Sequence, residues 1–471
     1  MGKIGLFGIG LDTYWSQFDG LLNRLKGYQQ QIKEQMEKHG ATVIDVGMVD
    51  NVDKAREAGE LLNKNGVDLV FLYVSTYALS STVLPVVQRI KAPFVILNLQ
   101  PVAAIDYQQF NALNDRGKMT GEWLAHCQAC SIPEIANVFN RSGIPYDFVT
   151  GYLDDEQAWH EIYQWIDASK VAQTMKNNNL GVLGHYYGGM LDVYTDLTQQ
   201  SAVFGNHIDL IEMCELAKLR AATTDAEVKT KISEFHKQFD VVSECSTDEI
   251  ERAAKTSVAL DKLVEKHQLG SLAYYYEGES GNEYENIVTS VIAGNTLLTG
   301  KHVPVSGECE VKNAQAMKIM DAFGAGGSFS EFYAMDFNDD IVMLGHDGPA
   351  HFEIAEGPVK LVPLPIYHGK PGKGLSIQMT VKHGPVTLLS VVQGKDDVFL
   401  LVAEGESVPG PILEIGNTNS RYRFKIGARK FINEWSRQGP AHHCAIGVGH
   451  MANKIDKLGQ ILNLRVVRIG C

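Results

Sequence analysis

The chain has 471 residues, 45% of them apolar and 21% charged, a balance typical of globular proteins and long enough for about three domains. Its 42 Lys and Arg against 56 Asp and Glu give a net charge of −14, which disfavours nucleic acid or an anionic membrane as a partner. The opening residues MGKIGLFGIG lack the apolar region of a signal peptide, and no run approaches the ~18 apolar residues of a membrane span. We therefore expect a cytoplasmic protein with no membrane contact.

Short apolar runs alternate with amphipathic stretches in the first third of the chain. The expected strands are residues 3–9, 41–49, 68–74 and 93–99, and the expected helices are 18–36, 53–64 and 80–90. Strands that alternate with helices predict βαβ units and a parallel, doubly wound sheet.

A second series of the same kind follows a long polar helix at 155–177. Its expected strands are 179–187, 207–216 and 271–278, and its expected helices are 226–239 and 247–268. After about residue 326 the pattern changes to apolar alternation broken by Gly, Pro and Asp, which is typical of antiparallel strands, with a helix at 450–462 and a strand at 463–469.

The fold predicted from this order is α/β, with two Rossmann-like doubly wound α/β domains followed by an antiparallel, β-barrel-like C-terminal domain. The expected domains are an N-terminal α/β domain at 1–172, a central α/β domain at 173–325 and a C-terminal β domain at 326–471.

Two motifs are weak on inspection. Gly5, Gly8 and Gly10 lie in and just after the first strand, but their spacing is not that of a dinucleotide loop, which favours a plain strand-to-helix turn. Cys127 and Cys130 form a Cys-x-x-Cys without the second pair or the histidines of a zinc site and without a strand just before it. We expect two small buried thiols there, with a redox or metal role as the alternative.

A stronger group of residues lies where the α/β and β regions meet. Glu308 follows a short strand, Glu331 lies in GGSFSEFY, His346 ends IVMLGH, and His442 and His443 stand together in GPAHHCAIG. Ligands in α/β proteins bind near the carboxyl ends of strands, and carboxylates with imidazoles suit Mn²⁺, Co²⁺ or Mg²⁺. Solvated carboxylates and structural histidines are the alternative.

The segments GECEVKNA, GGSFSEFY, LGH and the C-terminal HH resemble, in order and separation, the four metal-ligand segments of the L-arabinose isomerase family. The resemblance extends over essentially the whole chain. It implies a sugar isomerase that uses a divalent metal, usually Mn²⁺, with Glu308, Glu331, His346 and His443 as ligands and the two glutamates as the acid/base pair. It also implies a homotrimer or homohexamer whose active sites lie at subunit contacts.

The sugar-binding segments depart from the family pattern. The N-terminal Gln-His-Leu-Tyr of the family is replaced by Asp12 to Trp15, and Ser131 stands where a sugar-contacting His is expected. We therefore expect a substrate other than L-arabinose, with Tyr14, Trp15 and Gln128 as candidates for binding its hydroxyls.

The resulting hypothesis is a metal-dependent aldose–ketose isomerase that transfers a proton between C2 and C1 of a monosaccharide through an enediol. Two alternatives stay open: an epimerase or lyase acting on a sugar acid with the same metal ligands, and a non-catalytic sugar-binding protein.

Overall fold

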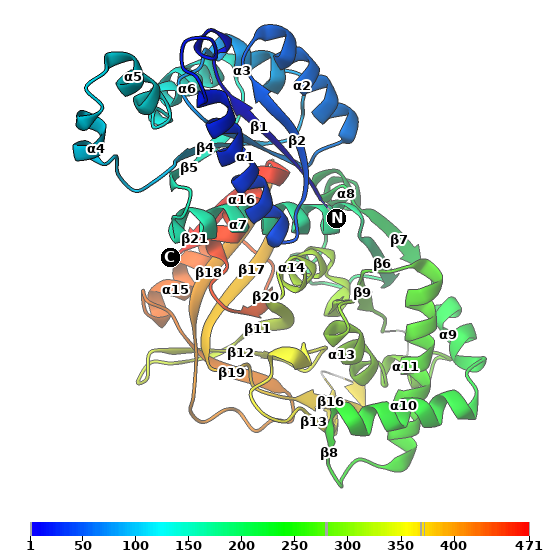
Figure 1. Ribbon diagram of the computed structural model, residues 1–471. Helices are drawn as coiled ribbons and strands as arrows, with labels where there is room; N and C mark the ends of the chain where they lie inside the picture. Colours follow the sequence, from blue (N-terminus) through cyan, green and yellow to red (C-terminus); the bar gives the residue numbers. More distant parts are fainter. Residues whose placement is uncertain (1, 278–280, 368–369, 372, 471) are drawn as a thin grey trace. The chain divides into compact units, whose positions relative to one another are not determined.

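The computed structural model describes residues 2–277, 281–367, 370–371 and 373–470. The chain divides into two compact units, Met1–Gln173 and Thr174–Cys471, and each is described by itself (Figure 1). The division of the chain into 1–172, 173–325 and 326–471 stays a prediction.

The first unit is built on a parallel sheet of strand order β2-β1-β3-β4-β5 (Figure 1). The strands are β1 (Lys3–Ile9), β2 (Thr42–Val49), β3 (Leu69–Val74), β4 (Phe94–Gln100) and β5 (Tyr146–Tyr152). The helices are α1 (Leu21–Lys38), α2 (Val52–Asn65), α3 (Ser80–Val87), α4 (Tyr107–Ala112), α5 (Arg116–Leu124), α6 (Ile132–Ser142) and α7 (Glu156–Lys176), whose last residues belong to the second unit. Every residue of β3 is buried, as expected of a central parallel strand that is covered on both faces.

The second unit begins with a parallel sheet of order β10-β9-β6-β7. Its strands are β6 (Asn179–Gly184), β7 (His207–Ile211), β9 (Ser271–Tyr275) and β10 (Val305–Ser306). Its helices are α8 (Leu197–Phe204), α9 (Met213–Ala221), α10 (Asp225–Gln238), α11 (Thr247–His267), α12 (Glu285–Val288), α13 (Ile292–Gly300) and α14 (Val311–Ala322).

Two strands predicted for this sheet extend beyond the strands in the structure. The prediction of a strand over 207–216 is wrong beyond Ile211, because α9 begins at Met213. Met213 and Leu216 are both buried and three residues apart, which is helical spacing. The strand expected at 271–278 ends at Tyr275, and residue 278 lies outside the described residues.

The C-terminal part of this unit is a closed antiparallel barrel, as predicted. Its six strands are β11 (Gly326–Asp336), β12 (Ile341–His346), β17 (Gly384–Gln393), β18 (Val398–Val408), β19 (Thr418–Arg423) and β20 (His443–Val448). They pair in the order β17-β20-β11-β12-β19-β18, and the pairing of β17 with β18 closes the ring. A seventh strand, β21 (Arg465–Ile469), runs parallel to β18 outside the ring.

The four described strands between residues 360 and 378, a stretch that the sequence analysis placed in the same β region, belong to other pairings. β13 (Lys360–Pro363) and β16 (Leu375–Gln378) form a small sheet with β8 (Asp240–Val241), and β14 (Ile366–Tyr367) pairs with β15 (Lys370–Pro371). The remaining helices are α15 (Ala428–Arg437) and α16 (Ala452–Leu462).

Helix α14 joins the parallel sheet to the barrel. It contacts β9 and β10 on the sheet side and β11, β17 and β20 on the barrel side (Figure 1). Residues from Val311 to Asp321 are buried, so this helix has no solvent-facing stripe. The loop before α14 is therefore held firmly, which fixes the position of the residues that enter it.

None of the helices in the described part of the chain is long and apolar enough to span a membrane.

Helix α15 packs against the barrel through an aromatic contact. Phe431 is buried and its ring stacks on Phe424, with ring centroids 3.6 Å apart. We expect Phe431→Ala to lower the free energy of unfolding of the second unit by about 3–5 kcal/mol, because it empties a packed aromatic site. Urea denaturation followed by circular dichroism measures the change. The neighbouring exposed Lys430 is the matched control, and equal effects of Phe431→Ala and Lys430→Ala would contradict this account of the packing.

Candidate active site

The four predicted metal ligands come together in the second unit. Glu308 lies in the short 3₁₀ turn Gly307–Cys309 between β10 and α14. Glu331 on β11 pairs directly with His443, the first residue of β20, and with Gly345 on β12, next to His346. The barrel register thus brings one carboxylate and two imidazoles together on three neighbouring strands, and the turn before α14 adds the second carboxylate.

Glu308 is held in an unusual backbone conformation. Its φ is 54° and its ψ is 18°, and Cys309 also has a positive φ of 58°. Residues other than glycine adopt this left-handed backbone region at a cost in free energy, and such residues are concentrated at functional sites. At Gly307 a Cβ atom would lie 2.8 Å from the Phe329 ring, so only glycine fits at the start of this turn.

The functional atoms of these side chains converge. His346 Nε2 lies 4.0 Å from Glu308 Oε1 and 4.0 Å from Glu331 Oε1. His443 Nε2 lies 3.5 Å from Glu308 Oε2. The Phe329 ring packs against both imidazoles, with its centroid 4.3 Å from that of His346 and 4.4 Å from that of His443, and the centroids of the two imidazoles are 5.3 Å apart. Glu308, His346 and His443 form one group whose ligand atoms lie within 4.8 Å of one another, and Glu331, His442 and His443 form a second.

Glu308 Oε2 and His443 Nε2 face each other without a hydrogen bond between them. His443 Nδ1 lies 2.6 Å from Glu310 Oε2, so Nδ1–H donates to this carboxylate and leaves a lone pair on Nε2. Within the described part of the chain, Glu308 Oε2 and His443 Nε2 are buried and have no hydrogen-bond partner. A lone pair on His443 Nε2 that faces a carboxylate oxygen is an arrangement that a bound cation would satisfy, and the residues present therefore fit a divalent metal.

A carboxylate stands behind each of the three histidines. Glu310 contacts His443, Asp192 Oδ2 lies 2.6 Å from His442 Nδ1, and Asp347 Oδ1 lies 3.2 Å from His346 Nδ1. The Glu310 and Asp192 contacts turn their rings so that Nε2 faces the site, which is the usual arrangement behind metal-binding histidines. Nδ1 of His346 also accepts the Gly348 backbone N–H at 3.0 Å. These three carboxylates were missed in the sequence. Glu310 stands two residues after Glu308, but Asp192 is remote and only the fold brings it to His442.

The two adjacent histidines have opposite electrostatic environments. Burial and the neighbouring charges of His346 and His442 lower the pKa of His443 well below its usual value, so its ring is neutral. Burial opposes charge on His442 too, but Glu308 and Asp192 outweigh it and raise the pKa of His442 to about 9. His442 is therefore an imidazolium whose Nε2 lies 3.3 Å from Glu308 Oε2. Of the two, His443 has the free lone pair that a metal requires.

The pKa values of Glu308 and Glu310 are shifted in opposite directions. Burial raises the pKa of Glu308, but His442, His443 and His346 outweigh burial and the net pKa is lowered. Burial raises the pKa of Glu310 to about 7 despite Lys312, whose Nζ lies 3.7 Å from it. Glu308 is thus an ionised carboxylate at neutral pH.

A pocket opens beside these residues. Its lining combines the carboxylate and imidazole of the site with an aromatic and aliphatic wall. It consists of Tyr187, Tyr274, Tyr275, Val291, Ile292, Asn295, Gly307, Glu308, His346, Asp347, Gly348 and Pro349. Aromatic walls with a few convergent polar groups are typical of small-molecule sites.

The three predicted substrate residues all belong to the first unit. The Trp15 indole N–H donates to Asp50 Oδ2 at 2.8 Å, and the Tyr14 ring meets Trp15 and Phe18 edge-on. The Gln128 side chain is buried and its amide donates to the carbonyls of Ser75 and Ala125. Gln128 thereby ties two loops of its own unit together.

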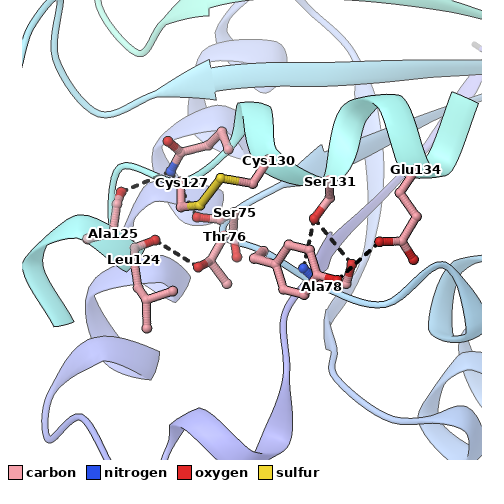
Figure 2. Close-up of a disulfide and its surroundings, with 11 residues drawn as sticks. Ser75, Thr76, Ala78, Leu124, Ala125, Cys127, Cys130, Ser131 and Glu134 are labelled. Atoms are coloured by element: carbon pink, nitrogen blue, oxygen red, sulfur yellow. Dashed lines mark hydrogen bonds between the residues drawn. A yellow bond between two sulfur atoms is a disulfide. The ribbon is translucent and has the colours of Figure 1, made fainter. Parts of the chain in front are cut away.

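The prediction of two separate thiols at the Cys-x-x-Cys is wrong, because the structure joins Cys127 and Cys130 in a disulfide (Figure 2). The pair lies between α5 and α6, where the chain turns through Ala129–Ser131. Ser131 and Glu134, just beyond it, bond to the loop after β3 through the backbone of Ala78 and Ser80. The short turn brings the two sulfurs together, which spacing alone did not indicate.

Counting thiols tests this pairing. We expect reduction to release two additional thiols per denatured chain, and Cys127→Ser combined with Cys130→Ser to remove this increase. The double variant should keep its metal content, because both ligand groups described above come from the second unit. An unchanged thiol count on reduction would contradict the disulfide, and loss of metal would contradict the ligand groups.

Comparison with known proteins now bears on the family. No protein-family model matches the chain. It is 20% identical over 336 residues to a sulfoquinovose isomerase of Alkalicoccus urumqiensis, covering 71% of this chain and 74% of that protein. It is 25% identical over 223 residues to the L-arabinose isomerase of Bacillus subtilis (strain 168), covering 45% of this chain and 43% of that protein.

A solved structure, an ABC transporter periplasmic solute binding protein of Actinobacillus succinogenes 130z with bound D-allose, is 11% identical over 65% of this chain and 78% of that one. Its TM-score of 0.18 is too low to carry an argument. The chain is thus similar, at low identity, to two sugar isomerases, one of which is an L-arabinose isomerase, in agreement with the family that its sequence motifs resemble.

Proposed function

We propose that this protein is a metal-dependent aldose–ketose isomerase that acts on a monosaccharide. The observation that carries the proposal is the pair of facing acceptors, Glu308 Oε2 and His443 Nε2, 3.5 Å apart and without hydrogen-bond partners among the described residues. The likeness to two sugar isomerases supports the reaction class.

The proposed ligands are Glu308, Glu331, His346 and His443, with Mn²⁺ as the metal, or Co²⁺ or Mg²⁺. Two carboxylates and two imidazoles suit these ions and leave coordination positions free for a substrate. When bound, the metal supplies Lewis-acid polarisation of the substrate's carbonyl and hydroxyl oxygens. Asp192 and the Glu310 carboxyl hold His442 and His443 in place.

The two glutamates supply the proton transfers. One takes the proton from C2 of the open-chain sugar and returns it to C1, and the other moves protons between O1 and O2. Glu308 suits such a role because it is ionised and held by the His442 imidazolium. Glu331 is the more accessible carboxylate, with 24% of its side chain exposed against 14% for Glu308.

Tyr187, Tyr274 and Tyr275 line the pocket and are proposed to bind the remainder of the sugar. Tyr14, Trp15 and Gln128 remain proposals for substrate binding. In the resembled family a neighbouring subunit completes each pocket, so we propose a homotrimer or homohexamer, which light scattering measures directly. An epimerase or lyase acting on a sugar acid, and a sugar-binding protein without activity, are the competing functions.

Glu308→Gln and Glu331→Gln test the proton transfers. Each keeps the side-chain size but removes the basic oxygen, and we expect turnover to fall at least ~10³-fold, because acid–base catalysis contributes ~10²–10⁴-fold and a metal ligand is weakened as well. The assay follows ketose formation by NMR over a panel of aldoses that includes L-arabinose and sulfoquinovose, with Mn²⁺ added. Exposed Glu353→Gln is the control. Full activity of Glu308→Gln would refute its role.

The same assay in D₂O separates two mechanisms. Proton transfer through an enediol places solvent deuterium at C1 of the ketose, whereas a hydride shift leaves none. Deuterium at C1 is the expected result. Its absence, with activity still dependent on Glu308 and Glu331, would keep the site and replace the mechanism.

Glu310→Gln tests the support behind His443. The amide keeps the shape but can present its NH₂ to Nδ1 and so favours the wrong ring tautomer, and we expect Mn²⁺ affinity to fall about 10- to 100-fold. Mn²⁺ binding followed by electron paramagnetic resonance measures this loss. The exposed Glu353→Gln variant is again the control, and Mn²⁺ affinity equal to that of the control would contradict the supporting role.

A further inference from the structure

A second group of metal-ligating side chains lies in the second unit, separate from the residues of the active site. His302, Asp321 and His351 each offer one ligand atom, and these atoms lie within 4.8 Å of one another. The three residues come from three segments: the turn after α13, the end of α14 and the loop after β12. None of them is one of the proposed ligands or their supporting carboxylates.

The geometry of the group centres on one oxygen atom. Asp321 Oδ1 lies 2.8 Å from His302 Nδ1 and 3.6 Å from His351 Nε2. In a tetrahedral zinc site with metal–ligand distances near 2.0–2.2 Å, ligand atoms are separated by roughly 3.3 Å. The observed distances lie on both sides of this value, so small side-chain rotations would place all three atoms around one ion.

The independent sign of a missing ligand is His351. Its side chain is 1% exposed, and within the described residues neither ring nitrogen has a hydrogen-bond partner. A buried imidazole without a hydrogen bond at either nitrogen is costly. Its Nε2 points toward the Asp321 carboxylate, where a bound cation would satisfy it.

The other contacts of His302 and Asp321 leave the ligand atoms available to a metal ion. Lys318 Nζ lies 3.2 Å from Asp321 Oδ2 and donates to the His302 carbonyl at 2.7 Å. This ammonium occupies the second carboxylate oxygen and leaves Oδ1 for the two imidazoles. His302 has a side chain that is 65% exposed, so solvent can reach a fourth coordination position.

We propose that His302, Asp321 and His351 form a second metal site, specific for Zn²⁺. Two imidazoles and one carboxylate with an open fourth position form the ligand set that zinc takes in proteins, whereas Mg²⁺ and Ca²⁺ prefer oxygen ligands. The site links the ends of α13 and α14 to the loop after β12. Zinc bound there stabilises the fold around the barrel and is not required for the isomerase reaction.

The test compares zinc binding by the full-length chain and two histidine variants. His302→Asn removes an exposed ligand, and asparagine tolerates the positive φ of 68° at this position. His207→Asn is the matched control, because His207 is also exposed and paired with an aspartate, at 2.8 Å from Asp209. Each protein is freed of metal with a chelator and titrated with Zn²⁺ by calorimetry.

We expect the wild type and His207→Asn to bind one more Zn²⁺ per chain than His302→Asn, or to bind it at least about 10- to 100-fold more tightly. Zn²⁺ should also raise the melting temperature of the wild type more than that of His302→Asn. Asp321→Asn, of the same size as the native residue, should lose the same ion, whereas Glu308→Gln should retain it. Retention by Glu308→Gln separates this proposal from the proposed active site.

Equal zinc stoichiometry and affinity in the wild type and His302→Asn would overturn the proposal, and His302, Asp321 and His351 would then be an ion-paired cluster only. A site that takes Mg²⁺ or Mn²⁺ in preference to Zn²⁺ would contradict the assignment of the metal.

Discussion

The proposed active site depends on one contact that no hydrogen bond satisfies, between Glu308 Oε2 and His443 Nε2. Neither atom can donate a proton to the other, because the ring proton of His443 is committed to Glu310 and Glu308 is ionised. Two facing acceptors are costly in a protein interior, and a cation bound between them would satisfy both. The strained turn at Glu308 and the buried carboxyl group of Glu310 both serve to keep these two atoms opposed.

Helix α14 joins the parallel sheet to the barrel, and this junction brings Glu308 and His443 together. The helix is buried between the parallel sheet and the barrel, so the turn at its start cannot move independently of either. The barrel contributes Glu331, His346 and His443 from adjacent strands whose register is set by backbone pairing. Residues separated by more than a hundred positions in the chain therefore meet with a geometry that no single segment could provide.

Much of the fold was predictable, because the hydrophobic period of each segment matched its environment. The continuous apolar run of β3 indicated a parallel strand, and the Gly- and Pro-broken alternation after residue 326 indicated antiparallel β structure. The end of β7 was missed because the apolar residues of HIDLIEMCEL recur at spacings that fit both a strand and a helix. The disulfide was missed because its formation depends on the turn between α5 and α6.

The candidate site was predictable only as a set of residue types. Four short motifs pointed to Glu308, Glu331, His346 and His443, but the choice between His442 and His443 needed the contacts of Asp192 and Glu310, which come from the tertiary fold. The most direct measurement is a crystal soaked with Mn²⁺ and examined by anomalous scattering. The account predicts a manganese peak in contact with Glu308 Oε2 and His443 Nε2. A fully soaked crystal with no peak between these atoms would contradict it.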